Sequence, residues 1–434
     1  MHVESRDAAR ELLQFIDRSP SPWHAAANMA QELRAAGFRE LSEAQPWDLQ
    51  AGQDYFVRRD DSSLVAFRVG KLPGSSLRIV GAHTDSPGFR VKPQPIIASD
   101  GMLRLAVEVY GGPIIPSFTD RELGLAGRVH YRTADGIVRR LVHIDRPLLR
   151  LQNVAIHLNR DVNEQGLKLQ RQDQLQLLLG LEADEKAGLN AFRGLLAEQA
   201  GCDGADVLGW ELAVVDTQPG AFFGMADEFI ANGQLDNLAS CHAGLRALLQ
   251  ASDAGTTRIL ACFDHEEVGS ESYAGAGGNF LETVLERMRD ALGVPPAEWA
   301  ITCSDSLLLS ADMAHAYHPA YPQLHDPQHR VYVNGGPVIK HNAAQRYATD
   351  GVGEAFFTAL CQGLGLPVQH YVHRNDLPCG STIGPMSAAR LGLRTLDVGA
   401  AMWAMHSARE SAGAADHLMM IRAMSGFYGA DSIG

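Results

Sequence analysis

A short apolar run that ends directly in acidic residues places the strongest constraint on this chain. Residues 259–263 are Ile-Leu-Ala-Cys-Phe, and Asp264, His265, Glu266 and Glu267 follow at once. The run predicts a buried strand, and α/β proteins keep their chemistry at the carboxyl edge of such strands. Two adjacent glutamates there can divide the work, one binding a metal and the other moving protons. A solvated loop is the alternative for this segment.

Four further segments place a histidine or a carboxylate at a predicted strand end or helix start. They supply His83 with Asp85, then Asp236, Asp312 and His406. Each segment alone is also explained by a surface turn, a helix cap or a surface histidine. Together they form a mixed nitrogen and oxygen ligand set that suits zinc, with manganese or cobalt as substitutes. We therefore predict a two-metal hydrolase in which Asp236 bridges the ions and Asp85 accepts the second ring N–H of His83.

The composition limits which classes of partner the protein can bind and which cellular compartment is expected. The net charge of -14 argues against nucleic acid or an anionic membrane as a partner, because no basic face would attract phosphates. The sequence contains no apolar segment long enough to span a bilayer and no signal peptide, and its six cysteines form no Cys-x-x-Cys pair. We expect a cytoplasmic protein. An acidic protein that binds an acidic substrate would need a local positive charge.

The length of 434 residues favours two domains. We expect an α/β catalytic domain formed by residues 1–90 and 232–434, with a mixed, mostly parallel sheet covered by helices. Short alternating segments between them predict an inserted β-rich domain, 91–231. The predicted elements include strands at 154–158 and 300–309, a helix at 344–363 and a final helix at 412–428.

Seven motifs, in the same order over essentially the whole chain, resemble the aspartyl aminopeptidase family of dinuclear zinc peptidases. They are His83–Pro87, Leu235–Leu238, Asp264–Ser270, Ser310–His315, Gly335–Lys340 with Gln345–Thr349, Arg374–Asp376 with Cys379–Pro385, and Met405–Ser407 with Arg409–Glu410. Two stretches of the expected insert, 111–121 and 160–176, depart from the family pattern. The first has none of the tryptophans usual in relatives.

The resemblance implies a role for each matching residue. It implies one metal on His83 and Asp312, a second on Glu267 and His406, and Asp236 between them. Glu266 would be the general base, with Asp85 behind His83. These roles agree with the chemistry read from the residues themselves.

The resemblance also implies a substrate and an assembly. Lys340 and Tyr347 would lie near the first side chain of the substrate, and His157 would reach a neighbouring subunit's active site. The expected substrates are short peptides with a free, acidic N-terminal residue, and the expected assembly is a homo-oligomer, a dodecamer. The resemblance also implies that the inserted domain, 91–231, serves as an oligomerisation or lid domain. For Lys340 the alternative is an exposed turn without a ligand, and for His157 it is a polar residue of an alternating strand.

Other functions remain open at this point. A relative of the same family could prefer neutral residues such as leucine. Carboxypeptidases and deacetylases share the broad architecture, and a non-catalytic peptide-binding shell could keep the fold. The presence of Glu266 beside a full ligand set argues against the shell.

Overall fold

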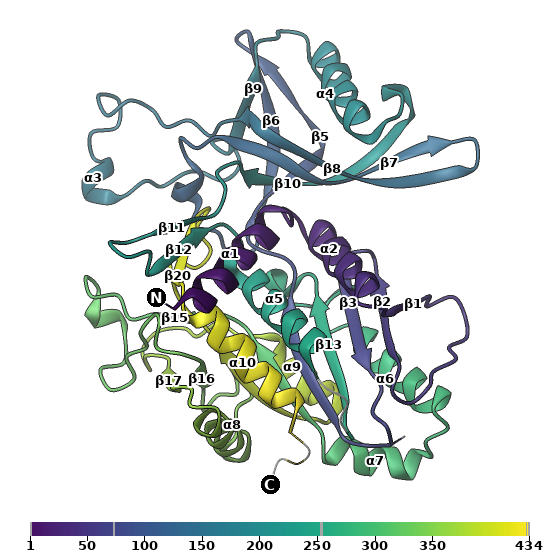
Figure 1. Ribbon diagram of the computed structural model, residues 1–434. Coiled ribbons are helices and arrows are strands. Elements are labelled where there is room, and N and C mark those ends of the chain that lie inside the picture. The colour runs from purple at the N-terminus through teal and green to yellow at the C-terminus, as the bar shows by residue number, and fades with distance from the viewer. Residues whose placement is uncertain (1, 73, 252–254, 431, 433–434) are drawn as a thin grey trace. The chain divides into compact units, whose positions relative to one another are not determined.

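The computed structural model describes residues 2–72, 74–251, 255–430 and 432. The chain forms two compact units (Figure 1). Unit 1 comprises Met1–Asp85, Gly220–Met405 and Glu410–Gly434, and unit 2 comprises Ser86–Pro219 and His406–Arg409. Most of unit 2 falls within the expected insert, 91–231, whose boundaries and role remain a prediction.

A nine-stranded mixed sheet forms the centre of unit 1. Its four central strands, β13, β4, β14 and β18, run parallel to one another, and antiparallel pairings occur on both sides of them. The expected mixed, mostly parallel α/β sheet is confirmed. In sheet order the strands are β1 (Arg39–Leu41), β2 (Asp54–Arg59), β3 (Ser63–Arg68), β13 (Thr257–Phe263), β4 (Leu77–His83), β14 (Leu307–Ala311), β18 (Arg394–Gly399), β16 (Val338–His341) and β17 (Gln369–Val372).

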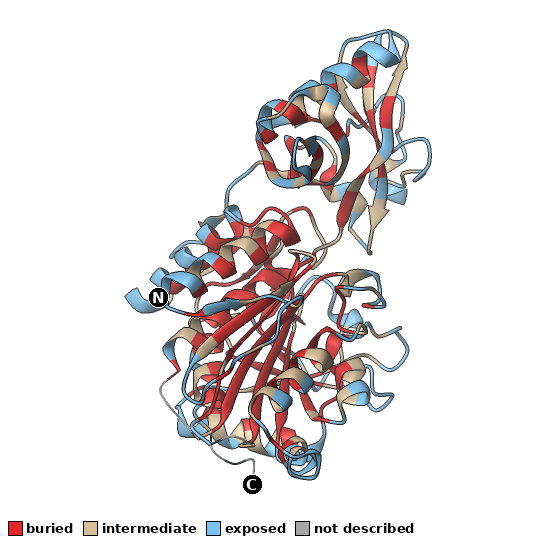
Figure 2. Cartoon of the chain, turned by 90° about the vertical axis from the view of Figure 1, so that its right-hand side faces the viewer, coloured by how far each residue is buried: buried red, intermediate tan, exposed pale blue. Residues whose placement is uncertain are grey.

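Helices cover both faces of this sheet, and every residue of β4, β13 and β14 is buried (Figure 2). On one face Val80 packs in a cluster with α1, α2, α5 and α10, and on the other Ile79 packs with α6. This alternation follows from the period of two along a strand. The helices of unit 1 are α1 (Val3–Asp17), α2 (Pro22–Ala35), α5 (Leu235–Gln250), α6 (Phe280–Ala291), α7 (Pro296–Ser304), α8 (Gly351–Gly363), α9 (Ile383–Leu391) and α10 (Asp416–Tyr428).

A smaller five-stranded sheet completes unit 1. In order its strands are β11 (Ala221–Phe223), β12 (Phe229–Asn232), β20 (Glu410–Gly413), β19 (Ala401–Trp403) and β15 (Ala314–His315). Two short 3-10 helices also belong to this unit, η3 (Glu266–Val268) and η4 (Pro322–Leu324).

Unit 2 is built on an antiparallel six-stranded sheet, as its alternating segments predict. Phe192, Leu196 and Ala200 of helix α4 (Glu185–Ala200) join the hydrophobic core of this unit. In order the strands are β8 (Gly136–Leu149), β7 (Leu123–Thr133), β10 (Val207–Asp216), β5 (Gly88–Ser99), β6 (Met102–Tyr110) and β9 (Gln176–Gly180). The short helices are η1 (Ile115–Phe118), α3 (Val162–Gln165) and η2 (Gly204–Asp206).

Four predicted elements differ in the structure. Residues 154–158 form no strand but run into a turn, and 300–304 belong to helix α7, so that strand β14 begins only at Leu307. The β-branched Ile301 and Thr302 favour a strand, but Pro296 at the first helical position starts a helix instead. The helix predicted at 344–363 begins only at Gly351, because the loop after β16 occupies the preceding residues. The helix predicted at 412–428 begins only at Asp416, because strand β20 ends at Gly413.

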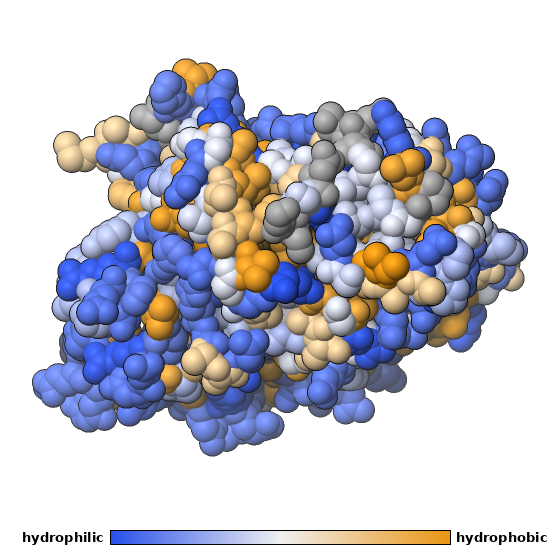
Figure 3. Space-filling model, turned by 90° about the horizontal axis from the view of Figure 1, so that it is seen from below, coloured by the Kyte–Doolittle hydropathy of each residue, from blue (hydrophilic) through white to orange (hydrophobic). Residues whose placement is uncertain are grey.

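No helix in the described part of the chain is long and apolar enough to cross a membrane. Seen from below, the surface is mainly hydrophilic, and its hydrophobic residues form separate patches (Figure 3).

Candidate active site

The carboxyl ends of three neighbouring parallel strands bring the predicted site residues together. Strand β4 lies between β13 and β14, so all three end at the same edge of the sheet. His83 is the last residue of β4 and pairs in register with Phe263, the last residue of β13. The acidic run 264–267 follows β13 directly, and Asp312 follows β14.

The imidazole of His83 contacts carboxylates through both ring nitrogens. Nε2 lies 3.4 Å from Oδ1 of Asp236 and 3.6 Å from Oδ1 of Asp312. Nδ1 lies 3.0 Å from the main-chain carbonyl oxygen of Asp85 and 3.4 Å from its Oδ1. A carbonyl oxygen only accepts, so Nδ1 carries a proton, and Nε2 is the ring nitrogen that could bind a metal ion.

The side chain of Asp85 is buried and holds the turn that carries the two glutamates. Its Oδ1 accepts the backbone N–H of Glu266 at 3.1 Å, and its Oδ2 accepts that of Glu267 at 3.2 Å. The sequence predicts contact with His83 only. Asp85 therefore holds the main chain of Glu266 and Glu267 as well as the ring of His83.

Asp236 lies at the start of helix α5 and is 3% exposed. Its backbone N–H donates to Oε2 of the buried Glu410 at 3.0 Å. The next residue, Asn237, donates its side-chain N–H to the carbonyl oxygen of Ala311 at 2.8 Å, which holds this turn against the end of β14. The peptide bond between Asp236 and Asn237 is cis.

The donor groups fit divalent cations. His83, Asp236 and Asp312 each offer a ligand atom within 4.8 Å of the others, and oxygens of Asp236 and Glu267 also lie within 4.8 Å of each other. Asp236 thus stands between two groups of donors, which is the place of a bridging carboxylate. Nitrogen and carboxylate oxygen donors of this kind suit zinc.

The carboxylates around His83 give the site a strongly negative electrostatic potential. Burial lowers the pKa of His83, but hydrogen bonds to Asp236, Asp312 and Asp85 outweigh burial and hold that pKa well above its usual value. Burial raises the pKa of Glu266 well above normal, and Asp312, Glu267 and Asp85 add to this rise while His83 opposes it. Five acidic groups around one imidazole require positive charge for stability.

Lys340 and Tyr347 lie beside this cluster. Lys340 is on strand β16 and 1% exposed, so the exposed-turn alternative for it is wrong. Its Nζ lies 3.2 Å from Oδ2 of Asp312, 3.2 Å from the carbonyl oxygen of Met313 and 5.0 Å from the ring centre of Tyr347. The cation is held between a carboxylate and an aromatic face.

The remaining predicted site residues, His406 and His157, belong to unit 2. Nδ1 of His406 donates to the carbonyl oxygen of Gly112 at 3.1 Å, which places the lone pair of the ring on Nε2, as a metal ligand requires. His157 is exposed in a turn. The functional assignments of both histidines remain predictions.

The comparison with known families decides the class of protein. A family model described as aminopeptidase I zinc metalloprotease (M18) matches residues 15–428. The chain belongs to the M18 family of zinc aminopeptidases. Membership confirms the expected zinc-dependent aminopeptidase and sets aside the carboxypeptidase and deacetylase alternatives.

Individual M18 proteins match this chain over nearly its whole length. The probable M18 family aminopeptidase 2 of Azotobacter vinelandii is 47% identical over 425 residues, which cover 96% of this chain and 97% of the relative. A cryo-EM structure of the Ape4 and Nbr1 complex superposes with a TM-score of 0.95 at 37% identity, covering 98% of this chain and 86% of the other. The S. cerevesiae mApe1 dodecamer gives a TM-score of 0.86 at 27% identity, covering 99% and 98%.

Three residues of this M18 chain lie at or near the site without a role assigned from the sequence: the buried Glu410 and Asp397, and the half-buried His315. Glu410 orients Asp236, and the buried Asp397 accepts hydrogen bonds from Ser310, 2.7 Å away, and from the backbone of Ala348, 2.6 Å away. Burial, with the nearby Lys340, lowers the pKa of His315 to about 4. For Asp397 the available signal is an aspartate between two apolar residues, Leu396 and Val398, in strand β18.

Proposed function

We propose that this protein removes acidic residues, aspartate before glutamate, from the N-termini of short peptides. The buried ammonium of Lys340 carries this proposal. Of its three N–H groups, two are directed at Asp312 and Met313, so one donor remains for the carboxylate of a substrate side chain. A buried charge-assisted hydrogen bond of this kind favours an acidic side chain over a neutral one.

Two zinc ions per chain would be held by the donor groups described above. We assign His83 and Asp312 to one ion, Glu267 and His406 to the other, and Asp236 to both. Bound zinc supplies Lewis-acid activation of water and of the peptide carbonyl. The positions of His83, Asp236, Asp312 and Glu267 within unit 1 support this assignment.

Glu266 acts as the general base. It takes a proton from the attacking water and delivers it to the leaving amine when the peptide bond breaks. The hydrogen bond from its backbone N–H to Asp85 fixes the position of this residue beside the ligand Glu267. A non-catalytic shell has no need for such a base.

Hydrolysis of matched Asp-, Glu-, Leu- and Lys-initiated dipeptides by the zinc-loaded protein tests the proposal. We expect turnover of the Asp and Glu substrates that a chelator abolishes and zinc restores. A preference for Leu would keep the metal mechanism and reject the acidic specificity. If no dipeptide is hydrolysed, the enzyme proposal is rejected in favour of the shell.

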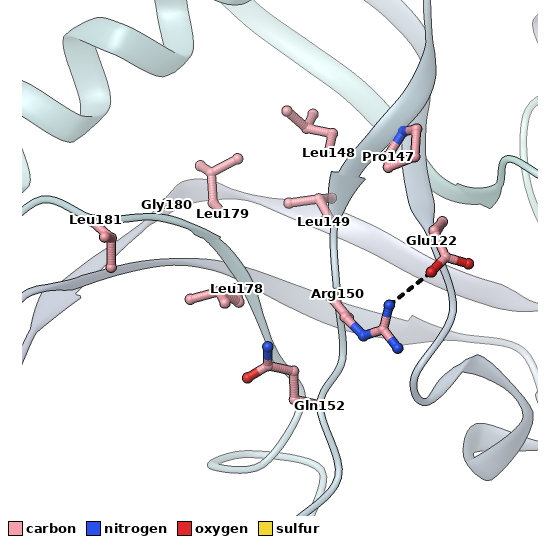
Figure 4. Close-up of a pocket in the computed structure, with 10 residues that line it drawn as sticks. All are labelled: Glu122, Pro147, Leu148, Leu149, Arg150, Gln152, Leu178, Leu179, Gly180 and Leu181. Carbon is pink, nitrogen blue, oxygen red and sulfur yellow. Dashed lines mark hydrogen bonds and ion pairs between the residues drawn. The ribbon is translucent and has the colours of Figure 1, made fainter.

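We also propose that the protein assembles into a homo-oligomer, with unit 2 providing subunit contacts. A shallow groove of about 270 Å³ in unit 2 is lined by leucines from β8, β9 and the residue after β9, beside an ion pair of Arg150 and Glu122 at 2.8 Å (Figure 4). Leu181 in this groove is 86% exposed. Such exposed apolar surface is typical of interaction sites, and a homologous structure is a dodecamer.

Light scattering of the intact protein tests the assembly. We expect twelve times the 46.9 kDa of one chain. Leu181→Glu should lower this mass, whereas the control Leu208→Glu, at a site 44% exposed on β10, should not. A monomeric wild-type protein would contradict the proposal.

A further inference from the structure

A second cluster of metal-binding side chains lies at the edge of the large sheet in unit 1. It consists of His341 on β16, His370 on the edge strand β17 and Glu354 on helix α8. Among the groups of possible metal ligands in the described residues, this is the one that shares no member with the candidate active site.

The three ligand atoms converge on one point. Nε2 of His341 lies 3.1 Å from Nδ1 of His370. Oε1 of Glu354 lies 3.5 Å from that Nδ1 and 3.9 Å from Nε2 of His341. Zinc bonds of about 2.0–2.1 Å in tetrahedral geometry separate two donors by roughly 3.3–3.4 Å. The observed separations therefore need only small side-chain movements to match a bound ion.

The backbone places these groups on the same side of the sheet. His370 pairs in register with Ile339, so both point to one face, and His341, two residues after Ile339, points there as well. Ile339 packs in one core cluster with Phe357 of α8, which is three residues after Glu354 on the same helix. Glu354 therefore projects toward the two histidines.

This face is opposite to the one that carries Lys340. Lys340 pairs with Tyr371, and Tyr371 packs in a separate cluster with Val338 and Tyr347. The cluster of His341, Glu354 and His370 is thus separated from the candidate active site by the strand itself.

We propose that His341, Glu354 and His370 form an additional binding site for a divalent transition metal such as zinc. Two imidazoles and one carboxylate supply three protein ligands, and the side chains are 26–38% exposed, so solvent can reach a fourth position. The ion takes the place of the proton shared by the two facing ring nitrogens. The alternative is a hydrogen-bonded trio that stabilises the contact of α8 with the sheet without a metal.

Zinc stoichiometry of the full-length protein distinguishes these two cases. Elemental analysis after equilibration with zinc and removal of excess should give one more ion per chain in the wild type than in His370→Asn or Glu354→Gln. Glu354→Gln is close in shape, so it remains informative if His370→Asn folds poorly. Glu286→Gln, at an exposed position on α6, is the matched control and should retain the wild-type number.

Crystals soaked in zinc give a second, local readout. We expect an anomalous peak between His341 and His370, and at least about a tenfold loss of zinc affinity in either variant. Equal zinc content in the wild type and both variants, or no peak at this position, overturns the proposal. The result does not depend on turnover, so it is separate from the fate of the proposed aminopeptidase activity.

Discussion

The buried Lys340 forms an ion pair with the partly exposed Asp312, with 3.2 Å between Nζ and Oδ2. Asp312 also faces His83 through its other oxygen, Oδ1. One carboxylate thus joins the candidate metal centre to the only charge that we propose for substrate selection. Changes at Lys340 should therefore be judged by ratios between substrates rather than by activity on one substrate.

Replacing Lys340 by methionine should reduce the preference for acidic residues. Hydrogen bonds to charged groups contribute about 1.5–3 kcal/mol, so kcat/KM for Asp-initiated dipeptides should fall about 10–100-fold relative to Leu-initiated ones. Steady-state kinetics with both substrates measures the ratio. Lys186→Met, at an exposed position in unit 2, is the control. An unchanged ratio would contradict the role of Lys340.

Glu266→Gln should retain zinc and lose activity by roughly 10²–10⁴-fold, the usual contribution of a general base. The amide keeps the shape of the side chain but accepts no proton. Zinc content and kcat are measured on the same preparation. Glu271→Gln changes a nearby exposed glutamate and should behave as the wild type. Substantial turnover by Glu266→Gln would rule out this residue as the base.

Asp85→Asn should weaken zinc binding about 10–100-fold, as is usual when a partner behind a ligand is removed. An asparagine presents an NH₂ group to one of the two backbone N–H donors of Glu266 and Glu267, so one hydrogen bond is lost. Competition with a chromophoric chelator gives the affinity. Asp48→Asn, which changes an exposed residue, serves for comparison. Equal affinities would show that the turn holds its shape without Asp85.

Gly399→Ala should destabilise the protein and displace Asp312. A Cβ atom at this position would lie 1.9 Å from the carbonyl oxygen of Asp312, so the backbone must shift. We expect a loss of about 1–3 kcal/mol in the free energy of unfolding and weaker zinc binding. Urea denaturation and chelator competition measure the two effects. Gly363→Ala, where nothing lies within 4 Å, should show neither.

The buried pair of His242 and His417 should make stability depend on pH. Nε2 of His242 accepts from Arg246 at 3.3 Å, so its Nδ1 donates to Nε2 of His417 at 2.8 Å. Burial, with Arg246, lowers the pKa of His417 to about 3, and burial with His417 and Arg246 lowers that of His242 well below normal.

Below pH 6.5 the unfolded chain therefore binds protons that the folded chain does not, and stability falls as the pH falls. Each histidine should lower the free energy of unfolding by about 1.5–2 kcal/mol between pH 6.5 and pH 5. His417→Gln should reduce the loss of unfolding free energy between pH 6.5 and pH 5 by the contribution of one histidine. Urea denaturation at both pH values measures this loss. His2→Gln should leave the slope unchanged, and an equal slope in both variants would contradict the prediction.

The sequence predicts the sheet and the acidic edge of the site because both follow from local patterns. An apolar run followed by carboxylates defines β13 and the residues after it without any knowledge of the fold. The burial of Lys340 does not follow from the sequence, because it results from packing of β16 between β17 and β18, which no local pattern reveals.

Contacts between distant segments account for most of what the sequence does not predict. The hydrogen bonds of Asp85 join it to residues about 180 positions later in the sequence. Glu410 accepts a hydrogen bond from the backbone of Asp236, which lies 174 positions earlier. His341, Glu354 and His370 are spread over three elements with no recognisable spacing. The sequence does not predict helix α7, because the β-branched residues of this helix favour a strand while a proline sets its start.

The two hydrogen bonds that Asp85 accepts couple the positions of Glu266, the proposed base, and Glu267, a proposed ligand. Glu266 and Glu267 are anchored through consecutive backbone N–H groups to one carboxylate, so neither can shift without the other. Variants in the turn 264–269 should consequently show zinc affinity and proton-transfer rate rising or falling together. An engineer who wishes to exchange the metal while keeping the rate would have to change the other proposed ligands, which are His83, Asp236, Asp312 and His406.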